Sequence, residues 1–346
     1  METIKVGILG ATGMVGQRFI QLLENHPWFE ISALAASEKS AGKNYEEAIS
    51  GRWKLDTPIP DKVRKMNIQE CTPNLDCKIV FSALDSSVAG PIEGDFAKSG
   101  YAVSSNSKNH RMDADVPLLI PEVNADHLDI VKEQKFGRGF IVTNPNCSVI
   151  GLVIALKPLQ DAFGIKKVFL TTMQALSGAG YPGVPSIDIL DNVYPYIGGE
   201  EEKIEIETLK LLGKLNNNKF EYADFKVSAQ CNRVNVRDGH LEAINIEFEK
   251  KPSLDEVKQV LINFNPLKQY NLPSSPPQPV IVREETDRPQ PRIDRESGKG
   301  MAVTIGRIRK CSLLDYKFLV LSHNTIRGAA GTAILNAELM KVKGLI

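Results

Sequence analysis

A cysteine at a strand-to-helix turn is the best candidate nucleophile in this sequence. Cys147 follows the Asn-Pro-Asn turn at 144–146, and apolar stretches flank it at 140–142 and 149–156. The first stretch predicts a buried strand, and the second predicts a buried helix that Pro158 stops. The N–H groups and the dipole of a helix N-terminus favour an anion, so this position is expected to lower the pKa of a thiol. A buried, purely apolar cysteine fits the local sequence equally well.

A second group of polar residues lies in the segment 231–243. Its Asp-Gly pair at 238–239 is a strong signal for a two-residue turn, so the segment predicts a β-hairpin. Directly opposed residues of a hairpin share a face, and the polar face would hold Arg233, Asn235, Arg237, His240 and Glu242. Histidine suits proton transfer near neutral pH, and arginine suits a bidentate grip on a carboxylate. A solvent-exposed face of ion pairs explains the same pattern.

Three glycines, Gly10, Gly13 and Gly16, lie between a predicted strand at 3–9 and a predicted helix at 15–23. In this context glycines let the backbone approach a dinucleotide pyrophosphate at the helix N-terminus. The spacing departs from the commonest G-x-G-x-x-G pattern, and a tight turn without a ligand is the other interpretation. We expect a dinucleotide site at this loop.

The end of the second predicted strand, 30–36, bears on the choice of nicotinamide cofactor. NAD enzymes usually carry Asp or Glu there to hold the ribose hydroxyls. This chain has Ala36-Ser37 instead, and Glu38 falls in the following loop. Ser37, Lys39 and Ser40 suit a 2′-phosphate, so we expect NADP rather than NAD. An ordinary polar loop is the alternative.

Charged residues elsewhere are further candidate contacts. Glu200 and Lys203 share one face of a predicted helix through their i, i+3 spacing. Acidic residues are also common in a first helical turn, so this pattern has a structural explanation as well. Arg111 suits either a phosphate or a surface ion pair.

Two loop segments contain further candidate residues. Gln174 ends a predicted strand before a glycine-rich loop that contains Ser177 and Gly178, and such loops allow close approach of a ligand. Asn324 precedes the last predicted helix, at 328–341, and is expected to be its N-cap.

Composition excludes several classes of function. The 42 basic residues balance the 42 acidic ones and form no basic block, which argues against nucleic acid as a partner. No apolar stretch is long enough to span a bilayer, and the N-terminal residues run directly into a strand, so we expect no signal peptide and no membrane partner. The five cysteines are scattered without a CxxC pair, which predicts a reducing, cytoplasmic location. The histidines form no cluster, so no metal site is expected.

The order of predicted elements indicates an α/β fold with two domains. Strands alternate with helices up to Cys147, as in a parallel Rossmann-type sheet. Later segments, such as 167–173 and 241–248, alternate between apolar and polar residues, as in a mixed, largely antiparallel sheet. We expect an NADP-binding domain at 1–146 and 325–346, and an α+β catalytic and dimerisation domain at 147–324.

These motifs resemble those of the aspartate-β-semialdehyde dehydrogenases, in particular the archaeal and fungal branch. The resemblance runs nearly from end to end, and its markers are the segments 10–16, 37–42, 144–148, 174–180, 233–240 and 324–328. The Asn-Pro-Asn-Cys turn combined with the Arg233 to His240 segment is its most specific element.

The resemblance implies an enzyme of amino-acid biosynthesis that serves lysine, threonine, methionine and isoleucine. Its reaction is the NADPH-dependent reductive dephosphorylation of L-aspartyl 4-phosphate to L-aspartate 4-semialdehyde through a cysteine thioester. Cys147 matches the nucleophile, His240 the acid/base, and Gln174 a residue that orients the substrate. Arg233 matches the grip on the α-carboxylate and Glu200 the contact to the amino group, with the register of 200–202 open by one residue. The remaining matches are Arg111 and Lys203 for phosphate, and Gly10, Thr12, Gly13, Met14, Val15, Gly16, Ser37, Ser40, Ser82, Ser177, Gly178 and Asn324 for NADP(H).

Other interpretations follow from the same residues. Malonyl-CoA reductase shares the fold and the nucleophile but has no substrate amino group to hold, and N-acetylglutamyl phosphate reductase is a more distant enzyme with similar chemistry. A non-catalytic NADP-binding sensor is the alternative outside enzymes. The family resemblance also implies a homodimer or homotetramer formed through the second domain.

Overall fold

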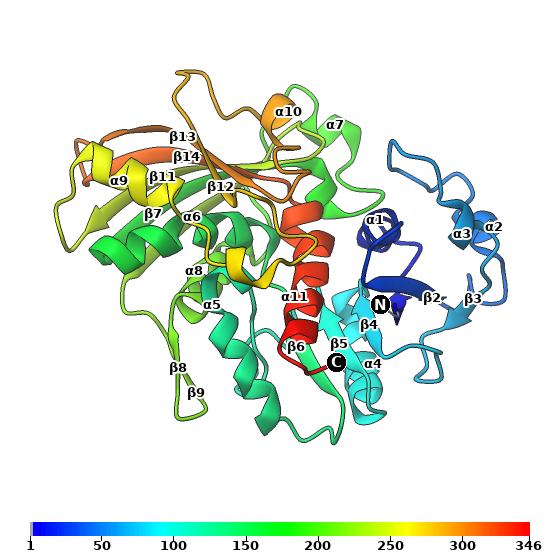
Figure 1. The fold of residues 1–346 in the computed structure, drawn as a ribbon. Coiled ribbons are helices and arrows are strands. Elements are labelled where there is room, and N and C mark those ends of the chain that lie inside the picture. Colours follow the sequence, from blue (N-terminus) through cyan, green and yellow to red (C-terminus); the bar gives the residue numbers. More distant parts are fainter. Residues whose placement is uncertain (1–2) are drawn as a thin grey trace.

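A parallel sheet forms the first half of the computed structural model, which describes residues 3–346 (Figure 1). The strand order is β3-β2-β1-β4-β5-β6, and every neighbouring pair is parallel. The strands are β1 Ile4–Leu9, β2 Phe29–Ala36, β3 Ile68–Glu70, β4 Ile79–Ser82, β5 Ala102–Ser105 and β6 Phe140–Thr143. Strands β4, β5 and β6 are buried along their whole length, as expected when helices cover both faces of a parallel sheet.

The helices of this half follow the strands in alternation, which confirms the predicted Rossmann-type arrangement. They are α1 Met14–Leu23, α2 Tyr45–Ile49, α3 Asp61–Arg64, α4 Ser86–Lys98, α5 Pro121–Asn124 and the 3₁₀ segment η1 Ala125–Glu133. Helix α1 buries Phe19, Ile20 and Leu23, whose spacing of one, three and four residues produces a single apolar stripe. Phe19 stacks on Phe81 of β4, with 4.9 Å between ring centroids.

The second half contains a mixed sheet with the order β10-β7-β11-β14-β13-β12. Its strands are β7 Ile165–Gln174, β10 Lys226–Arg233, β11 His240–Phe248, β12 Val280–Arg283, β13 Val303–Lys310 and β14 Tyr316–Ser322, and β8 Lys214–Asn216 pairs with β9 Lys219–Glu221 apart from it. The three central pairs are antiparallel and the two outer pairs are parallel. The predicted mixed, largely antiparallel sheet is therefore confirmed.

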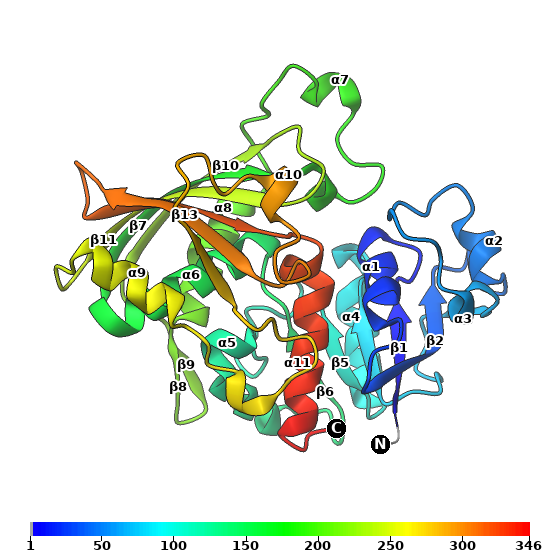
Figure 2. The same cartoon turned by 45° about the horizontal axis from the view of Figure 1, so that its top comes forward.

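Helices cover one face of this second sheet. Figure 2 shows α6, α8 and α9 on one side, while loops around α7 and α10 lie at the other. The helical segments are α6 Cys147–Phe163, η2 Leu176–Ala179, α7 Ser186–Ile189, α8 Glu200–Leu211, α9 Leu254–Ile262, η3 Lys268–Tyr270, α10 Pro291–Asp294, the π-helical turn η4 Ile326–Ala330 and α11 Gly331–Val342. Along β11, residues on the helix side are buried and the alternate residues are half-buried.

Helix α6 is longer than the sequence predicted. Pro158 lies inside it, and the helix ends only at Phe163, where Gly164 adopts a φ of +67°. Proline removes one backbone N–H donor, but Leu159 and Phe163 beyond it are buried in the core of the second half. Their burial offsets the lost hydrogen bond, so the prediction that Pro158 stops the helix is wrong.

The predicted hairpin at 231–243 is also wrong. Strand β7 lies between β10 and β11, pairing parallel with the first and antiparallel with the second. The segment 234–239 therefore crosses over one strand instead of turning tightly. Asn235 and Arg237 lie in this crossover and are exposed, and Arg237 donates to Asp56 at 2.9 Å. An Asp-Gly turn signal is local and cannot reveal a strand that pairs from far away in the sequence.

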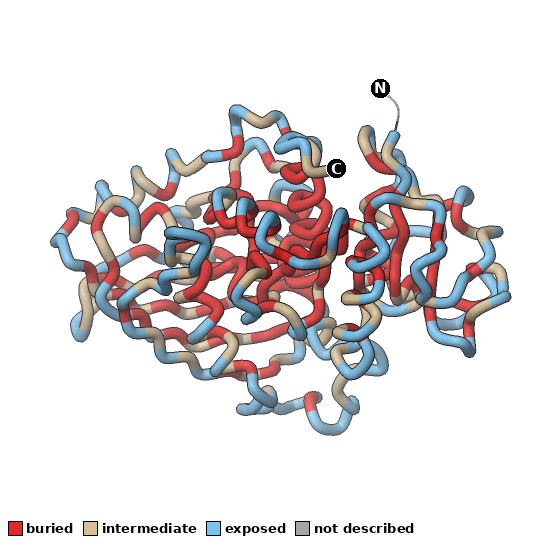
Figure 3. The backbone as a smooth tube through the Cα atoms, turned by 90° about the horizontal axis from the view of Figure 1, so that it is seen from below, coloured by how far each residue is buried: buried red, intermediate tan, exposed pale blue. Residues whose placement is uncertain are grey.

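The segment after β14 returns to the first half. Residues of η4 and α11 belong to the same hydrophobic core as β1, β4 and α1, and Figure 3 shows buried backbone in the interior of the molecule with exposed backbone around it. Arg327 of η4 forms a 2.7 Å ion pair with Glu122 of α5, and both side chains are fully buried. This return joins the two halves next to the start of α6.

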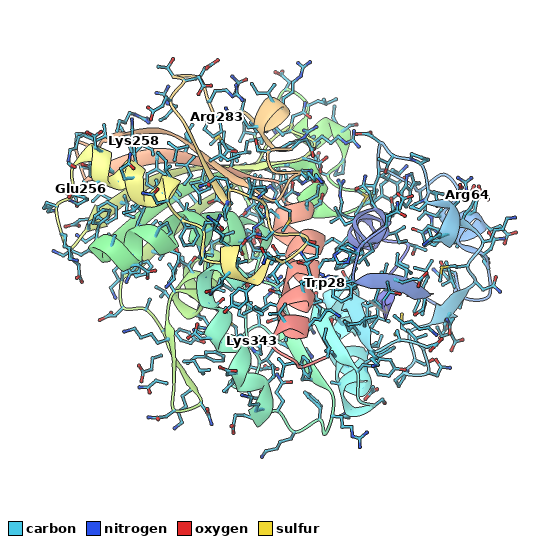
Figure 4. All side chains as sticks on the ribbon, in the orientation of Figure 1. Trp28, Arg64, Glu256, Lys258, Arg283 and Lys343 are labelled. Atoms are coloured by element: carbon cyan, nitrogen blue, oxygen red, sulfur yellow. The ribbon has the colours of Figure 1, made fainter. Side chains whose placement is uncertain are left out.

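Charged side chains lie mainly on the outside of the molecule, as the labelled Arg64 and Lys258 illustrate in Figure 4. Both form surface ion pairs, Arg64 with Glu46 at 3.0 Å and Lys258 with Glu284 at 2.7 Å. All five cysteines are free. Within residues 3–346, no helix has the length and apolar character needed to cross a membrane, and no cluster of metal-binding side chains occurs.

Candidate active site

Cys147 is the first residue of α6, and its thiol faces His240 at the start of β11. The distance from Sγ to Nε2 is 3.2 Å. Asn146 is the N-cap of the helix, and its Oδ1 accepts from the backbone N–H of Ser148 at 2.8 Å. The local sequence thus places the thiol at a capped helix N-terminus, and long-range pairing of β11 brings the imidazole to it.

Three neighbouring strands contribute a row of side chains to the same face of the second sheet. Arg233 of β10 is opposite Gln174 of β7, and the register of β11 continues the row to His240. All three residues are buried, with exposures of 5%, 1% and 0%. Sequence reasoning predicted the shared face for Arg233 and His240, although it assigned them to adjacent strands.

The hydrogen bonds of His240 fix the position of its proton. The backbone N–H of Ala175 donates to Nδ1 at 3.0 Å, so a neutral ring carries its hydrogen on Nε2. Burial lowers the pKa of His240 well below its usual value, and the positive charge of Arg233 lowers it further. The ring is therefore neutral at physiological pH, with Nε2–H donating toward the sulfur.

The thiol does not have the lowered pKa expected at a helix N-terminus. Burial raises the pKa of Cys147 to about 12, and the negative charge of Glu200 adds to the increase. Arg233 and Arg111 act in the opposite direction but do not compensate. Desolvation of the thiolate outweighs the helix N-terminus in this site, so the expectation of a lowered pKa is wrong.

Helix α8 forms the wall of the site beside the Asn-Pro-Asn turn. Glu200 is 6% exposed, and its Oε1 accepts from Nδ2 of Asn146 at 2.8 Å. Lys203 donates to Glu200 Oε2 at 3.2 Å. Glu202 points to solvent, and Glu201 accepts from the backbone N–H of Cys231 instead. Of the three consecutive glutamates, Glu200 is the one that reaches the turn before Cys147.

Arg111 is 8% exposed and reaches the same wall from the loop after β5. Its Nη1 donates to Glu207 of α8 at 2.9 Å, and its Nη2 donates to the carbonyl of Asn106 at 3.0 Å. The second oxygen of Glu207 accepts from the backbone N–H of Asn146 at 2.6 Å. Sequence reasoning missed Glu207, because a glutamate in an acidic helix resembles a surface residue; its i, i+7 spacing from Glu200 was the available signal.

Gly178 packs directly on the row formed by Arg233, Gln174 and His240. A Cβ atom at this position would lie 2.8 Å from Nη1 of Arg233 and 3.1 Å from Cε1 of His240. Arg233 Nη1 also donates to the carbonyl of Ala175 at 2.7 Å. Gln174 donates weakly to Thr172 at 3.4 Å. The glycine-rich loop after β7 thus lies over Arg233 and His240, and a larger residue at Gly178 would require these side chains to shift.

A two-part cavity runs from the glycine loop along the end of β2. One part, of about 560 Å³, is lined by residues that include Gly10, Thr12, Gly13, Met14, Val15, Ser37 and Tyr181. The other, of about 540 Å³, shares Ser37 with the first part and is lined further by Glu38, Lys39, Cys71 and Thr72. A cavity of two adjoining parts, lined at one end by the glycine loop, suits an extended dinucleotide.

The glycine loop is shaped for close backbone approach. Gly10 has a φ of +74°, and a Cβ atom there would lie 2.6 Å from the carbonyl oxygen of Ala83. A Cβ atom on Gly16 would lie 2.3 Å from the carbonyl oxygen of Gly10. The end of β2 carries Ala36, and the exposed Glu38 lies beyond it. The residues present therefore fit a dinucleotide whose ribose carries a 2′-phosphate.

Other residues expected at the cofactor differ in accessibility. Asn324 is not a helix cap: its Oδ1 accepts from the backbone N–H of Gly239, and its Nδ2 donates to Ser177 Oγ, both at 2.8 Å. This pair joins the crossover before β11 to the loop after β7. Ser40 is 5% exposed. Ser82 is fully buried at the end of β4, so the hydroxyl of Ser82 is covered by protein.

Comparisons with known proteins agree with this geometry. The family model described as semialdehyde dehydrogenase, NAD binding domain, matches residues 5–131, and the one described as semialdehyde dehydrogenase, dimerisation domain, matches residues 156–327. The chain is 55% identical over 339 residues to an aspartate-semialdehyde dehydrogenase of Archaeoglobus fulgidus, covering 97% of each chain. It is 51% identical over 359 residues to that of Schizosaccharomyces pombe, covering 100% of both. The crystal structure of the Candida albicans enzyme with NADP matches with a TM-score of 0.92 and 48% identity, covering 100% of both chains. This chain belongs to the aspartate-semialdehyde dehydrogenase family.

Proposed function

We propose that this chain catalyses the NADPH-dependent reduction of L-aspartyl 4-phosphate to L-aspartate 4-semialdehyde in the biosynthesis of the aspartate-family amino acids. The observation that carries this proposal is the 3.2 Å contact between Cys147 and His240 beside the buried Arg233. Acyl transfer from an acidic substrate requires a thiol, a hydrogen-bond donor and a cationic group that binds the substrate carboxylate, all close together.

The substrate is held at two ends in this proposal. Arg233 binds the α-carboxylate, Glu200 accepts from the amino group, and Gln174 orients the chain between them. Arg111 and Lys203 bind the phosphate. A malonyl-CoA substrate offers no amino group to Glu200, so this contact would not form.

Acyl transfer begins at the sulfur. Sγ of Cys147 attacks the acyl carbon, the bond from that carbon to the phosphate oxygen breaks, and a thioester remains on Cys147. Because Nε2 of His240 already carries a hydrogen, the thiol proton leaves with the phosphate rather than on the imidazole. In this proposal the thiol is neutral before attack, in line with the raised pKa of Cys147.

NADPH, when bound, supplies the hydride that reduces this thioester. Nε2–H of His240 donates to the oxyanion that then develops, and the C–S bond breaks to release the aldehyde. The same Nε2–H stabilises the departing thiolate until it is reprotonated. The glycine loop, together with Ser37, Ser40, Ser177, Gly178 and Asn324, would hold the cofactor.

We further propose the division into an NADP-binding domain at 1–146 and 325–346 and a catalytic and dimerisation domain at 147–324; residues 1–2 lie outside the described part. All strands of the parallel sheet precede Cys147, and α11 packs on that sheet through Ser104, whose hydroxyl donates to Ala333 at 3.3 Å. The cytoplasmic location expected from the scattered cysteines stays a prediction.

A second copy of the chain is the proposed occupant of the uncovered face of the second sheet. Met173, Leu241 and Leu319 are half-buried on this face, and Phe169 is 48% exposed there. The adjoining loop exposes Ile187, Leu190, Val193 and Tyr196. Exposed apolar area of this kind marks an interface, and it lies in the segment matched by the dimerisation domain. We infer a homodimer through this face.

The test is a pair of spectrophotometric assays. Phosphate-dependent reduction of NADP⁺ with L-aspartate 4-semialdehyde is expected, with no comparable malonyl-CoA-dependent oxidation of NADPH. Cys147→Ser is expected to abolish acyl-enzyme formation. Activity with malonyl-CoA alone, or an unchanged burst in the Ser variant, contradicts the proposal.

A further inference from the structure

Glu207 is a buried charge that the reaction described above does not use. It is 2% exposed, and α8 places it on the same face as Glu200 and Lys203 through i, i+3 and i+7 spacing. A buried carboxylate is costly unless its oxygens are paired. Both oxygens of Glu207 are paired, and each partner belongs to a different part of the site.

The two partners of Glu207 are a substrate-binding group and the turn of the nucleophile. Oε1 accepts from Nη1 of Arg111 at 2.9 Å, and Oε2 accepts from the backbone N–H of Asn146 at 2.6 Å. Asn146 directly precedes Cys147. One carboxylate therefore joins the guanidinium of Arg111 to the peptide that starts α6.

The bonds of Arg111 leave part of its guanidinium available. Nη1 donates one hydrogen to Glu207 and Nη2 donates one to the carbonyl of Asn106, and Nε is buried without a hydrogen-bond partner among residues 3–346; the second hydrogens of Nη1 and Nη2 remain. A guanidinium has five N–H donors in a rigid fork. The two fixed bonds set the plane of this fork, and the remaining donors define where an anion binds.

The backbone of the Arg111 loop is held independently of Glu207. Nζ of Lys210, one helical turn further along α8, donates to the carbonyls of Arg111, Asp113 and Val116 at 2.7, 3.1 and 3.1 Å. A change at Glu207 therefore releases the Arg111 side chain while Lys210 retains the loop. Because Lys210 holds the loop backbone and Glu207 holds the Arg111 side chain, a variant of Glu207 can misplace the side chain without unfolding the loop.

We propose that Glu207 is a positioning residue, which sets the Arg111 guanidinium against the phosphate of the substrate and fixes the Asn146 peptide beside the nucleophile. This inference rests on the proposed function, because it assigns phosphate binding to Arg111. Only a carboxylate satisfies both donors: a glutamine has a single acceptor oxygen, and its NH₂ group would face either a guanidinium or a backbone N–H.

The experiment compares Glu207→Gln with Glu202→Gln in the phosphate-dependent oxidation of L-aspartate 4-semialdehyde. Glu202 lies on the same helix and is exposed, so it controls for the loss of one helical charge. We expect Glu207→Gln to raise the KM for phosphate on the order of tenfold or more, because small misplacements of binding groups have large effects. The KM values for the aldehyde and NADP⁺ should stay within about twofold.

A double-mutant cycle with Arg111→Ala tests whether Glu207 acts through the guanidinium. In the Arg111→Ala background, adding Glu207→Gln should change the KM for phosphate by less than about twofold, since coupled residues are not additive. Two independent, multiplying effects would overturn the proposal, and so would an unchanged KM for phosphate in Glu207→Gln.

If Glu207→Gln does not fold, Glu207→Asp decides the matter. Aspartate keeps the charge but is one methylene shorter, so we expect it to fold and to raise the KM for phosphate with little change in the KM for the aldehyde. Wild-type kinetics in the aspartate variant would overturn the proposal. Failure of the proposed function would look different, because the wild-type enzyme would then show no phosphate-dependent NADP⁺ reduction.

Discussion

His240 illustrates how neighbouring backbone decides the chemistry of a single residue. The N–H of Ala175 occupies Nδ1, and burial together with Arg233 lowers the pKa of the ring. A neutral imidazole with hydrogen on Nε2 is a hydrogen-bond donor and not a base toward the thiol. Sequence alone indicates a histidine near a cysteine but does not indicate which nitrogen carries the hydrogen.

Replacing His240 with alanine removes the donor that faces Sγ. We expect kcat to fall by about 10²- to 10⁴-fold, with the KM for phosphate nearly unchanged because Arg111 and Lys203 remain. Steady-state kinetics of the purified variant measure both values. Near-normal turnover would exclude His240 from the reaction.

Glu242 gives a prediction about stability and pH. It is 1% exposed, and neither carboxylate oxygen has a hydrogen-bond partner among the described residues. Burial raises its pKa well above the usual value, and Glu200 adds to the shift. The folded state then binds a proton that the unfolded state has lost above its ordinary pKa of about 4.3, so this residue reduces stability progressively as the pH rises above that value.

A neutral isostere removes this dependence. Glu242→Gln should be more stable than wild type at pH 8, and the difference should shrink as the pH falls toward 4.5. Urea unfolding at several pH values measures the free energy of unfolding of both proteins. A constant difference across this range would show that Glu242 is ionised in the folded state.

Among the elements, the π-helical turn η4 controls the start of α6. A Cβ atom on Gly328 would lie 2.9 Å from Cβ and 3.0 Å from the carbonyl oxygen of Cys147. The buried pair between Arg327 and Glu122 holds this turn in place and leaves little room for adjustment. Cys147 is therefore positioned by a segment that is far away in the sequence.

Gly328→Ala should cost about 1–3 kcal/mol of stability, as overpacking does, and should lower kcat because Cys147 must shift. Gly94→Ala is the matched control, since a Cβ atom there has open space within α4. It should stabilise the protein by up to about 1 kcal/mol. Urea unfolding measures the stability of both variants, and kinetic assays measure their kcat. Equal changes in stability and kcat for the two variants would contradict the steric argument.

The sequence predicts elements well where the signal is local. The strand-glycine-helix unit at Gly10 and the strand and turn before Cys147 were confirmed, because apolar runs and glycines mark them directly. The hairpin at 231–243 and the stop at Pro158 failed, because the insertion of β7 and the burial of Phe163 are tertiary effects. Glu207 was missed for the same reason: its partners are distant in the sequence.

At the scale of the whole molecule, the uncovered face of the second sheet gives a prediction about assembly. Phe169→Glu places a charge in the proposed interface and should produce a monomer with unchanged secondary structure. Leu313→Glu, at a position 90% exposed in the turn between β13 and β14, should leave the dimer intact. Sedimentation velocity distinguishes these outcomes, and a dimeric Phe169→Glu variant would place the interface elsewhere.

The raised pKa of the Cys147 thiol also bears on oxidative damage. Peroxides and alkylating agents react with thiolates, and very little thiolate exists at neutral pH when the pKa is about 12. Cys311 is half-buried like Cys147, but the backbone N–H groups of Leu314 and Leu313 lower its pKa. Under oxidative stress, sulfenic acid should therefore form first at Cys311, which would leave the Cys147 thiol intact.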